Sequence, residues 1–372
     1  MMLGKTICDL APGQTNNRNS EGAFITLKNE AILFVYTRYR GAGHDDECTA
    51  DLYGMLSEDE GETFGEPFPV FTCEEVGADN VMSVSLLRME NGDIGLFYLQ
   101  KHNTERFCEP YFVRSADEGK TWSGHMRCVK EHGYYVLNND RMLCLKNGRI
   151  LMPLAKHEVT ICPDGTVRFG EGRIFILASD DDGYNWYSLA ENIALPVKVW
   201  NDPQSGGLGS CSSAMEPGLV QLANGLVWCF IRTTLGRQYE MFSEDNGVSW
   251  TVPAPSRFTS PSSPLCVKRL SDERLFAVWN PVPKYNGSAD VVEGIWTDGR
   301  KQLNAAKLSA DAKEFLQMDV LEYDEGSGYC YTAIFETNSG DILLAYCAGG
   351  KGDGNCLSRL RVRKIYLETF IN

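Results

Sequence analysis

The chain has 372 residues, of which 43% are hydrophobic and 23% are charged, a composition typical of a folded protein with a sizeable apolar core. Its 35 basic and 50 acidic residues give a formal net charge of −15, which argues against nucleic acid or an anionic membrane as a partner. No apolar run approaches the roughly 18 residues of a spanning helix, and the first residues lack the apolar stretch of a signal peptide, so we expect a cytoplasmic protein.

The 13 cysteines are an odd number and show no paired Cys-x-x-Cys spacing. Cys144, Cys229, Cys266 and Cys347 stand inside apolar runs, where a free thiol behaves as a small buried hydrophobe. This pattern favours reduced thiols over a metal site or a disulfide framework. We therefore expect no cysteine-bound metal ion.

Six segments predict a strand, a tight turn and a second strand, because apolar residues alternate or run together on both sides of a turn. They cover residues 24–36, 84–99, 142–154, 219–231, 266–279 and 333–346. Three of the turns are Asn-Gly, at Asn91-Gly92, Asn147-Gly148 and Asn224-Gly225, the strongest short hairpin signal. Successive turns are about 48 to 77 residues apart, the length of a four-stranded unit with its loops.

Between the hairpins a second motif recurs, with the form Ser-x-Asp-x-Gly-x-Thr-aromatic. Good copies lie at 57–64, 115–122, 179–186 and 243–250, and a decayed fifth copy lies at 309–315. The Asp can accept hydrogen bonds from its own turn, the Gly supplies a positive φ, and the aromatic residue packs beneath the loop. Because the spacing differs from an EF-hand and the distal Glu is missing, we interpret the motif as a turn between strands.

The two repeats together predict an all-β, six-bladed β-propeller of four-stranded antiparallel blades, forming a single domain over residues 1–372. Each hairpin supplies the two inner strands of a blade, and each box caps the turn between the two outer strands. The sixth blade lacks a box, but a late strand at 360–366 and a first strand at 6–10 can complete it. Pairing of the two chain ends would close the ring and remove the open sheet edge.

Polar and aromatic residues stand just before the innermost strand of each predicted blade, where the strands converge at one mouth of the central channel. They are Arg18, Asp79-Asn80, Asn138-Asn139-Asp140-Arg141, Glu216, Ser260 and Tyr331. A turn-forming role accounts for one or two of these residues, but not for Arg, Glu and Tyr at matching positions of several blades. The sequence therefore predicts the functional site at this mouth.

The repeated box on an all-β chain of this length resembles the Asp box, or BNR repeat, of the sialidases (neuraminidases), and the resemblance covers nearly the whole chain. It implies an exo-acting retaining glycoside hydrolase that releases a terminal sialic or related nonulosonic acid, without a cofactor. Because such a substrate carries a carboxylate on its anomeric carbon, these enzymes use a Tyr nucleophile instead of Asp or Glu. The box also decorates propellers that are not sialidases, so the function depends on the site residues.

The resemblance implies the catalytic roles at the predicted mouth. Tyr331, in Tyr-Thr-Ala-Ile, resembles the family's nucleophile, and Glu216, in Glu-Pro-Gly, resembles the Glu that takes the phenolic proton. The family places the acid for the leaving group between the first arginine and the first box. There the stretch 44–47 reads His-Asp-Asp-Glu, and we favour Asp46 narrowly over Asp45.

The same resemblance implies a set of substrate-binding residues. Arg18, Arg232 and Arg300 resemble the three arginines whose planar forks hold the substrate carboxylate. Arg237 and Tyr239, just after Arg232, are also expected to reach this mouth and contact the substrate. Asp140 and Arg141 depart from the family's pattern, and they are either a simple salt bridge or substrate-binding residues of a neighbouring subgroup that takes another acidic sugar. The predicted ligand is therefore a small acidic sugar or a sialylated glycan.

Two alternatives stay open on the sequence alone. One is a propeller hydrolase or lyase for another acidic sugar, such as a uronate, that uses its Tyr and Arg residues differently. The other is a glycan-binding propeller without catalysis. A scaffold that only presents loops to protein partners is least favoured, because it gives no reason for three arginines to converge.

Overall fold

The computed structural model describes residues 3–41, 43–165, 167–197, 213–283, 291–292, 295–296 and 299–366. Nearly all regular elements are strands, and the helices among the described residues are two short 3-10 turns, η1 (Glu74–Val76) and η3 (Lys351–Asp353). The predicted all-β class is confirmed. None of the helices in the described ranges has the length and apolar character needed to cross a bilayer.

Four of the described sheets have four antiparallel strands each. The first runs in the order β2 (Arg18–Thr26), β3 (Ile32–Tyr39), β4 (Ala50–Ser57) and β5 (Phe68–Phe71). The second runs β15 (Met215–Gln221), β16 (Val227–Arg232), β17 (Arg237–Ser243) and β18 (Ala254–Thr259). The third runs β19 (Cys266–Arg269), β20 (Leu275–Trp279), β23 (Gln302–Leu308) and β24 (Phe315–Tyr323). The fourth runs β25 (Cys330–Glu336), β26 (Ile342–Cys347), β27 (Leu360–Ile365) and β1 (Lys5–Leu10).

A larger sheet of nine strands lies between the first and second of these in sequence. One part contains β6 (Asn80–Arg88), β7 (Ile94–His102), β8 (Phe107–Ser115) and β9 (Met126–Arg127). The other contains β11 (Leu143–Cys144), β12 (Ile150–Ile161), β13 (Val167–Ser179) and β14 (Tyr187–Ile193). The sequence predicts two separate sheets here, but β10 (Tyr134–Val136) pairs with both β8 and β12 and joins them. A two-stranded ribbon, β21 (Val291–Val292) with β22 (Ile295–Trp296), stands apart.

The six predicted hairpins are confirmed as the strand pairs β2–β3, β6–β7, β11–β12, β15–β16, β19–β20 and β25–β26. At the Asn-Gly turns, Gly92, Gly148 and Gly225 have φ values of 87°, 87° and 90°. Glycine adopts these angles without steric cost, which is why the turns could be recognised in the sequence.

The four good boxes form turns between the third and fourth strands of their units. In the first copy, Ser57 Oγ accepts a hydrogen bond from the Gly61 N–H at 2.9 Å, and Asp59 Oδ1 accepts one from the Thr63 N–H at 2.8 Å. The other three copies repeat both contacts. The carboxylate of each box is thus engaged by its own turn, as the turn interpretation requires.

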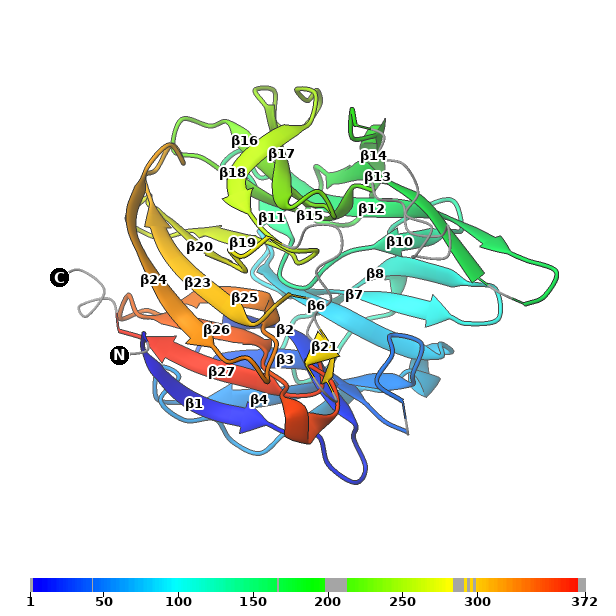
Figure 1. Cartoon of the computed structure of the whole chain (residues 1–372), viewed down its shortest axis with the longest axis vertical. Coiled ribbons are helices and arrows are strands. Elements are labelled where there is room, and N and C mark those ends of the chain that lie inside the picture. The colour runs from blue at the N-terminus through cyan, green and yellow to red at the C-terminus, as the bar shows by residue number, and fades with distance from the viewer. Residues whose placement is uncertain are drawn as a thin grey trace.

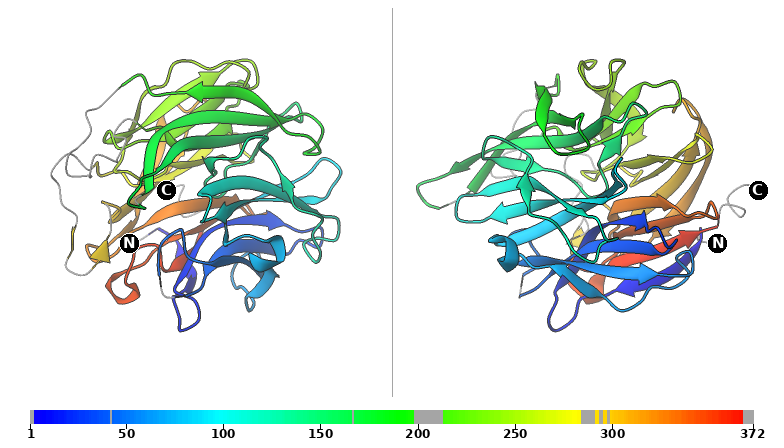
Figure 2. Two further views of the ribbon diagram at one scale, coloured as in Figure 1. Left: turned by 90° about the vertical axis from the view of Figure 1, so that its right-hand side faces the viewer. Right: turned by 180° about the vertical axis from the view of Figure 1, so that it is seen from behind.

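The first strands of the predicted blades, β2, β6, β11, β15, β19 and β25, gather near the middle of the molecule, with later strands outside them (Figure 1). Strand β2 contacts β6 and β25, and β19 contacts β15 and β25. The two ends of the chain share a sheet, because β1 pairs with β27 (Figure 2). Apolar clusters fill the spaces between neighbouring sheets, and one of them includes both Leu33 of β3 and Leu96 of β7.

Candidate functional site

The first strands of four sheets share a backbone irregularity near their beginning. Strands β2, β6, β15 and β25 each contain a bulge that holds a non-glycine residue with positive φ. These residues are Glu21 (52°), Ser83 (61°), Glu216 (41°) and Tyr331 (58°). A bulge re-aims the side chain it carries, and each such conformation costs about 1–3 kcal/mol. Strain repeated at matching positions points to this region as the functional site.

Two of these residues, Glu216 and Tyr331, meet across the site. The Tyr331 hydroxyl donates to Glu216 Oε1 at 3.3 Å, although 115 residues separate them in the chain. Arg232 Nη1 donates to the same carboxylate oxygen at 2.6 Å and lies 3.3 Å from the Tyr331 hydroxyl. The side chains of Arg232 and Glu216 are each only 12% exposed. The fold therefore brings together the predicted nucleophile, its predicted proton acceptor and the second arginine.

The phenol of Tyr331 stays protonated in this setting. Burial and the negative charge of Glu216 raise the pKa of Tyr331 well above its ordinary value, against the opposing charges of Arg232 and Arg300. At neutral pH the hydroxyl therefore needs a base before it can act as a nucleophile. Glu216 Oε1 is already its hydrogen-bond acceptor and can take the proton directly.

A second Tyr–Glu–Arg group shows that hydrogen bonds alone do not make a site. The Tyr346 hydroxyl donates to Glu322 Oε1 at 2.7 Å, and Arg363 Nη2 donates to the same oxygen at 2.7 Å. Tyr346 is 0% exposed, and the two charged side chains are 3% exposed, so a ligand has no access to them. Tyr331, in contrast, is partly exposed and lines a cavity.

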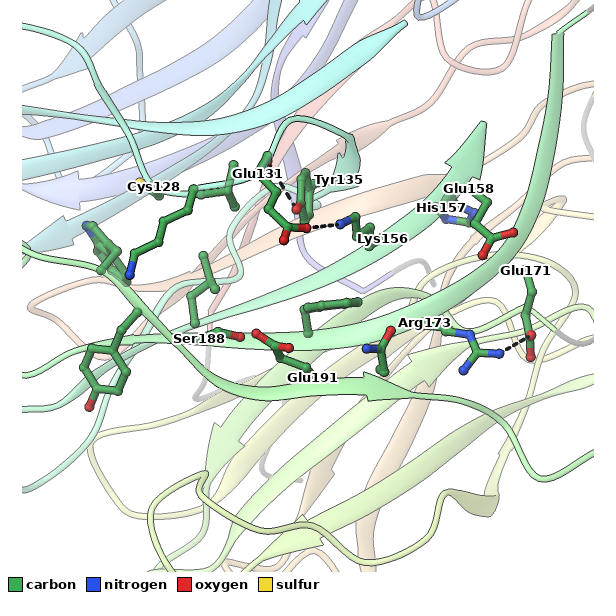
Figure 3. A pocket seen from close by; sticks show the side chains of 17 residues that line it. Cys128, Glu131, Tyr135, Lys156, His157, Glu158, Glu171, Arg173, Ser188 and Glu191 are labelled. Atoms are coloured by element: carbon green, nitrogen blue, oxygen red, sulfur yellow. Dashed lines mark hydrogen bonds and ion pairs between the residues drawn. The ribbon is translucent and has the colours of Figure 1, made fainter. Parts of the chain in front are cut away.

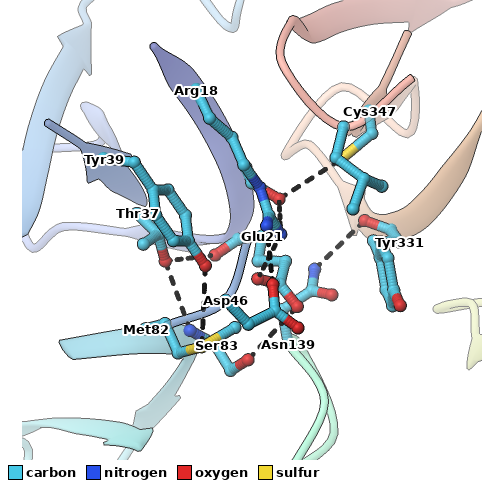
Figure 4. A network of polar contacts seen from close by, with 12 residues as sticks. Arg18, Glu21, Thr37, Tyr39, Asp46, Met82, Ser83, Asn139, Tyr331 and Cys347 are labelled. Atoms are coloured by element: carbon cyan, nitrogen blue, oxygen red, sulfur yellow. Dashed lines mark hydrogen bonds and ion pairs between the residues drawn. The ribbon is translucent and has the colours of Figure 1, made fainter. Parts of the chain in front are cut away.

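Arg18, the first residue of β2, is held between two carboxyl groups (Figure 4). Its Nη1 donates to Asp46 Oδ1 at 2.6 Å, and its Nη2 lies 3.4 Å from Glu21 Oε2. The guanidinium also lies 4.3 Å from the centre of the Tyr39 ring. Glu21 in turn accepts a hydrogen bond from Ser83 Oγ at 3.2 Å. The side chain of Arg18 is 1% exposed, whereas that of Asp46 is 50% exposed and reachable by a ligand.

The pKa values of the two carboxyl groups beside Arg18 are shifted in opposite directions. Burial, with the negative charges of Asp46 and Glu216, raises the pKa of Glu21 to about 8 despite the charge of Arg18. Desolvation acts in the same direction on Asp46, but the charges of Arg18, Lys101 and Arg300 outweigh it and lower the pKa to about 2. At neutral pH in the free protein, Asp46 is therefore ionised and Glu21 is mostly protonated.

Arg300 lies close to both Tyr331 and Arg232. Its Nη2 donates to the backbone oxygen of Ser262 at 3.0 Å, and Ser262 Oγ accepts from Arg232 Nη2 at 3.0 Å. The Arg300 guanidinium lies 5.3 Å from the centre of the Tyr331 ring, and its Nη1 lies 3.2 Å from Cys330 Sγ. Ser262 thus holds two of the three predicted arginines side by side.

A small cavity of about 40 Å³ joins the two halves of the site. Its walls include all three carboxyl groups of the site and the phenol. The complete lining is Glu21, Asp46, Met82, Ser83, Leu99, Lys101, Cys108, Tyr134, Val136, Asn138, Glu216 and Tyr331. In the free protein, Arg18 is paired with the Asp46 carboxylate and Arg232 with the Glu216 carboxylate.

Three of the other predicted residues do not join this group. Asp45 and Asp46 are both exposed, and it is Asp46 whose carboxylate contacts Arg18. Arg237 Nη1 donates to the backbone oxygen of Ser256 at 3.2 Å. Tyr239 is 5% exposed and belongs to an apolar cluster. Both lie on β17, the third strand of its sheet, and neither lines the cavity.

Asp140 and Arg141 connect strands instead of lining the cavity. Asp140 forms an ion pair with Lys268 at 2.8 Å and accepts a hydrogen bond from the Ile334 N–H at 3.0 Å. Arg141 Nη2 donates to the backbone oxygen of Leu265 at 2.8 Å. Their side chains thus tie the segment before β11 to β19 and β25, and neither lines the cavity.

The sequence analysis did not predict three residues of the site, namely Glu21, Lys101 and Ser262. Glu21 could have been found, because it follows Arg18 by three residues at a matching blade position. Lys101, at the end of β7, is 3% exposed and donates to the backbone oxygen of Asp46 at 2.9 Å. Neither Lys101 nor Ser262 carries a local sequence signal, since their contacts depend on the packing of distant segments.

A larger cavity of about 670 Å³ lies between β10 and the strands β12, β13 and β14 (Figure 3). Charged pairs cross its wall, with Lys156 and Glu131 at 3.2 Å and Arg173 and Glu171 at 3.1 Å. It contains none of the predicted site residues and none of the four strained residues at the bulges of β2, β6, β15 and β25. This cavity has the larger volume, but the smaller cavity is lined by Tyr331, Glu216 and Asp46, and we therefore place the candidate site there.

One acidic cluster in the described part of the chain has a spacing compatible with a metal ion, formed by Asp51, Cys73 and Glu74. Arg40 already forms ion pairs with both carboxylates of this cluster, at 2.8 Å to Asp51. We therefore assign no metal to it.

Comparison with known proteins gives a family and a fold. The family described as BNR repeat-like domain matches residues 75–344. The intramolecular trans-sialidase from Ruminococcus gnavus has a TM-score of 0.70 at 13% identity, over 98% of this chain and 97% of that chain. The NanB sialidase from Streptococcus pneumoniae has a TM-score of 0.68 at 14% identity, over 98% of this chain and 71% of that chain.

A protein of unknown function from Dyadobacter fermentans DSM 18053 has a TM-score of 0.69 at 19% identity, over 97% of this chain and 99% of that chain. No curated protein sequence matches the chain. At these identities the similarity to solved structures shows the fold.

Proposed function

The chain belongs to the family of BNR repeat-like domains with a sialidase-like fold, and from this premise we propose that it is an exo-acting retaining glycoside hydrolase of the sialidase type. Its substrate is a glycan that ends in a sialic or related nonulosonic acid. One observation carries the proposal, namely the 3.3 Å contact between the Tyr331 hydroxyl and Glu216 Oε1 at a cavity that Asp46 also lines.

The proposal includes a closed, six-bladed propeller in a single domain. The pairing of β1 with β27 supports closure by the two ends of the chain. The nine-stranded sheet divides naturally into β6–β9 and β11–β14 on either side of β10, which supports six blades instead of five. In this arrangement the site lies where the first strands of the blades begin.

Substrate binding begins with an exchange of partners at Arg18. In the free protein Arg18 Nη1 is engaged by Asp46 at 2.6 Å. The substrate carboxylate takes this place, and Arg232 and Arg300, which share Ser262, complete the grip. Asp46 then loses its strongest positive neighbour, so its pKa rises from about 2 and the group can carry a proton. Binding thereby prepares the acid that the leaving group needs.

The reaction proceeds in two displacements. In the first, the Tyr331 oxygen bonds to the anomeric carbon, its proton passes to Glu216, and the glycosidic bond breaks as Asp46 protonates the leaving oxygen. In the second, water attacks the anomeric carbon and gives its proton to Asp46, while the Tyr331 oxygen leaves and recovers its proton from Glu216. The products are the free acidic sugar, with retained configuration, and the shortened glycan.

A neutral phenol suits this substrate better than a carboxylate nucleophile. Two negative charges 4 Å apart repel each other by about 4 kcal/mol at an effective dielectric constant of about 20. Tyr331 avoids this repulsion until its proton moves to Glu216. Arg232 and Arg300 then stabilise the developing phenolate, since both lower the pKa of Tyr331.

Turnover of a panel of 4-methylumbelliferyl glycosides, covering sialic acid, other nonulosonic acids and uronic acids, tests the proposal. Wild-type protein should release the fluorophore from the sialoside or a related nonulosonic acid. Tyr331→Phe should bind the same sugar without turning it over, because the phenyl ring keeps its packing but lacks the oxygen. Tyr346→Phe is the matched control, since it removes an equivalent hydroxyl away from the cavity.

The outcomes separate the candidate functions. Turnover of uronides alone would support a hydrolase or lyase for another acidic sugar. Binding without turnover in wild-type protein would indicate a glycan-binding propeller. Unchanged turnover in Tyr331→Phe would remove Tyr331 as the nucleophile.

A further inference from the structure

Three buried cysteines lie together directly behind Tyr331. Cys330, Cys347 and Cys356 form a cluster with Leu357, against which Tyr331 packs. Cys330 is 1% exposed, and the other two thiols are 0% exposed. All three are free thiols. The hydrolytic scheme gives none of them a role, so the cluster needs another explanation.

The strand register places two of these thiols opposite each other. Cys330 of β25 is the direct antiparallel partner of Cys347 on β26. Directly opposed residues in such a pair have Cα atoms about 4.5–5.5 Å apart. A disulfide needs Cα atoms about 4.4–6.8 Å apart, so the backbone permits this bridge without a large movement.

The two thiols differ in reactivity. Burial alone would raise the pKa of Cys330, but hydrogen bonds from Cys347 and Cys356 and the charge of Arg300, whose Nη1 lies 3.2 Å away, hold it well below its ordinary value. Burial and the neighbouring Cys330 sulfur raise the pKa of Cys347. The pair thus combines a thiolate, which is the reactive form, with a protonated partner.

We infer that Cys330 and Cys347 are a redox-sensitive dithiol, whose reversible disulfide is formed by hydroperoxides and inactivates the adjacent site. The bridge itself follows from the contacts of the two cysteines, whereas its effect on activity rests on the proposed function.

Hydrogen peroxide is the oxidant, and it accepts two electrons from the pair of thiols. The Cys330 thiolate attacks one peroxide oxygen, the O–O bond breaks, hydroxide leaves, and a sulfenic acid forms on Cys330. The Cys347 sulfur then attacks the Cys330 sulfur, the S–S bond forms, and the departing hydroxide leaves as water with the thiol proton. The two sulfurs together lose two electrons, which the peroxide gains. A dithiol reductant reverses the change by thiol–disulfide exchange.

The bridge changes contacts on both sides of the site. Arg300 Nη1 loses a charged acceptor in Cys330 Sγ. Ser20 Oγ lies 3.2 Å from Cys347 Sγ, and Ser20 also accepts from Arg18 Nη2 at 3.2 Å, so the network of the first arginine is affected too (Figure 4). Tyr331 follows Cys330 directly and reaches Glu216 by a contact of 3.3 Å. A displacement of about 1 Å at such a group can reduce turnover by about 10²-fold.

A metal ion explains the cluster less well than a disulfide. Among the described residues, the group of three ligand atoms that all lie within 4.8 Å of one another is Asp51, Cys73 and Glu74, and the three thiols do not meet this spacing. A shared thiophilic ion would need all three sulfurs at short range. A disulfide needs only Cys330 and Cys347, which the register already pairs.

Mapping of the oxidised protein tests the inference without relying on enzyme activity. The full chain is treated with hydrogen peroxide, free thiols are alkylated with N-ethylmaleimide in denaturant, and non-reduced peptides are identified by mass spectrometry. The Cys330 and Cys347 peptides should be cross-linked, and dithiothreitol should release them. Cys229 is the internal control, because it is equally buried in an apolar cluster that raises its pKa, and it should remain alkylated.

Activity is measured on the same samples. Turnover should fall by about 10²-fold on oxidation and return with dithiothreitol. The double variant Cys347→Ala/Cys356→Ala leaves Cys330 without a resolving thiol in the cluster, so it should form no reversible bridge there. Its turnover is compared with its own untreated sample. If this variant does not fold, the mapping of wild-type protein still decides the question.

Several results would overturn the inference. These are an alkylated Cys330 after oxidation, a bridge from Cys330 to Cys356 in place of Cys347, or a bridged protein with full turnover. A protein that turns over no acidic sugar but still forms the Cys330–Cys347 bridge would refute the proposed function and leave the dithiol standing.

Discussion

Replacing Glu216 by Gln is a sensitive perturbation of the site, because it removes a charge and a base while keeping the shape. Glu216 Oε1 accepts from both Tyr331 and Arg232, and a Gln carbonyl can still accept both hydrogen bonds. A phenolate 3.3 Å from a carboxylate is repelled by about 5 kcal/mol at an effective dielectric constant of about 20. The substitution removes this repulsion, so the pKa of Tyr331 should fall toward its ordinary value under the influence of Arg232 and Arg300.

The loss of the base and the easier ionisation have different pH signatures. General-base help is worth about 10²–10⁴-fold in rate, or about 3–5 kcal/mol of barrier at 1.36 kcal/mol per factor of ten. Near neutral pH, Glu216→Gln should therefore reduce kcat by that factor. Because only the phenolate form of Tyr331 can then react, kcat should rise about tenfold per pH unit until the phenol is ionised.

The assay is kcat against pH with a 4-methylumbelliferyl sialoside, whose good leaving group needs little help from Asp46. Glu322→Gln is the matched control, because Glu322 also accepts from a Tyr and an Arg but lies outside the cavity. That control should lose about 3–5 kcal/mol of stability as a broken buried pair, with kcat of the folded protein unchanged. A Glu216→Gln profile that is lower than wild type but parallel to it would refute the base assignment.

Three further predictions concern the acid, the boxes and the packing. Asp46→Asn should lower kcat by about 10²–10⁴-fold on alkyl-linked sialosides, and far less on aryl sialosides. Hydrogen bonds from Thr121 and Ser249 hold the pKa of Asp117 and Asp245 at about 2, so their stabilisation is present above about pH 4 and lost as pH falls toward 2. The Tm of the wild-type protein should therefore fall between about pH 4 and pH 2, and Asp117→Asn should make this fall smaller. Gly218→Ala should lower the free energy of unfolding by about 1–3 kcal/mol, because the added Cβ would stand 2.1 Å from the Phe230 ring. Chemical denaturation measures this loss.

Local signals account for the parts of the fold that the sequence predicts well. The hairpins could be located because Asn-Gly turns have angles that glycine alone adopts freely, as at Gly92 and Gly225. The bridging strand β10 could not, because Tyr134–Val136 is too short to show a period and pairs with β8 and β12 only through tertiary packing. Its aromatic residues carry no information about which strand they will join.

The site residues also differ in whether a local sequence signal or only tertiary packing indicates their position. Arg18, Glu216 and Tyr331 could be placed near one another because the repeat locates each of them close to the beginning of a first strand. Arg237 was expected there because it follows Arg232 closely, but it begins the third strand, and its side chain bonds to β18.

The choice between Asp45 and Asp46 also depended on packing. The contact that distinguishes Asp46 joins it to Arg18, 28 residues earlier, and neither segment alone indicates it. Lys101 was missed for the same reason, since only the fold brings the end of β7 to the backbone of Asp46.

Trapping the intermediate is the most direct test of Tyr331 as the nucleophile. The reagent is 2,3-difluorosialic acid, which forms a covalent intermediate in a structure of the Trypanosoma rangeli sialidase. Incubation of this protein with the same reagent, followed by peptide mapping, should place one sugar on the Tyr331 oxygen and none in Tyr331→Phe. A sugar on any other residue, or turnover of a sialoside with no trapped adduct, would contradict the account.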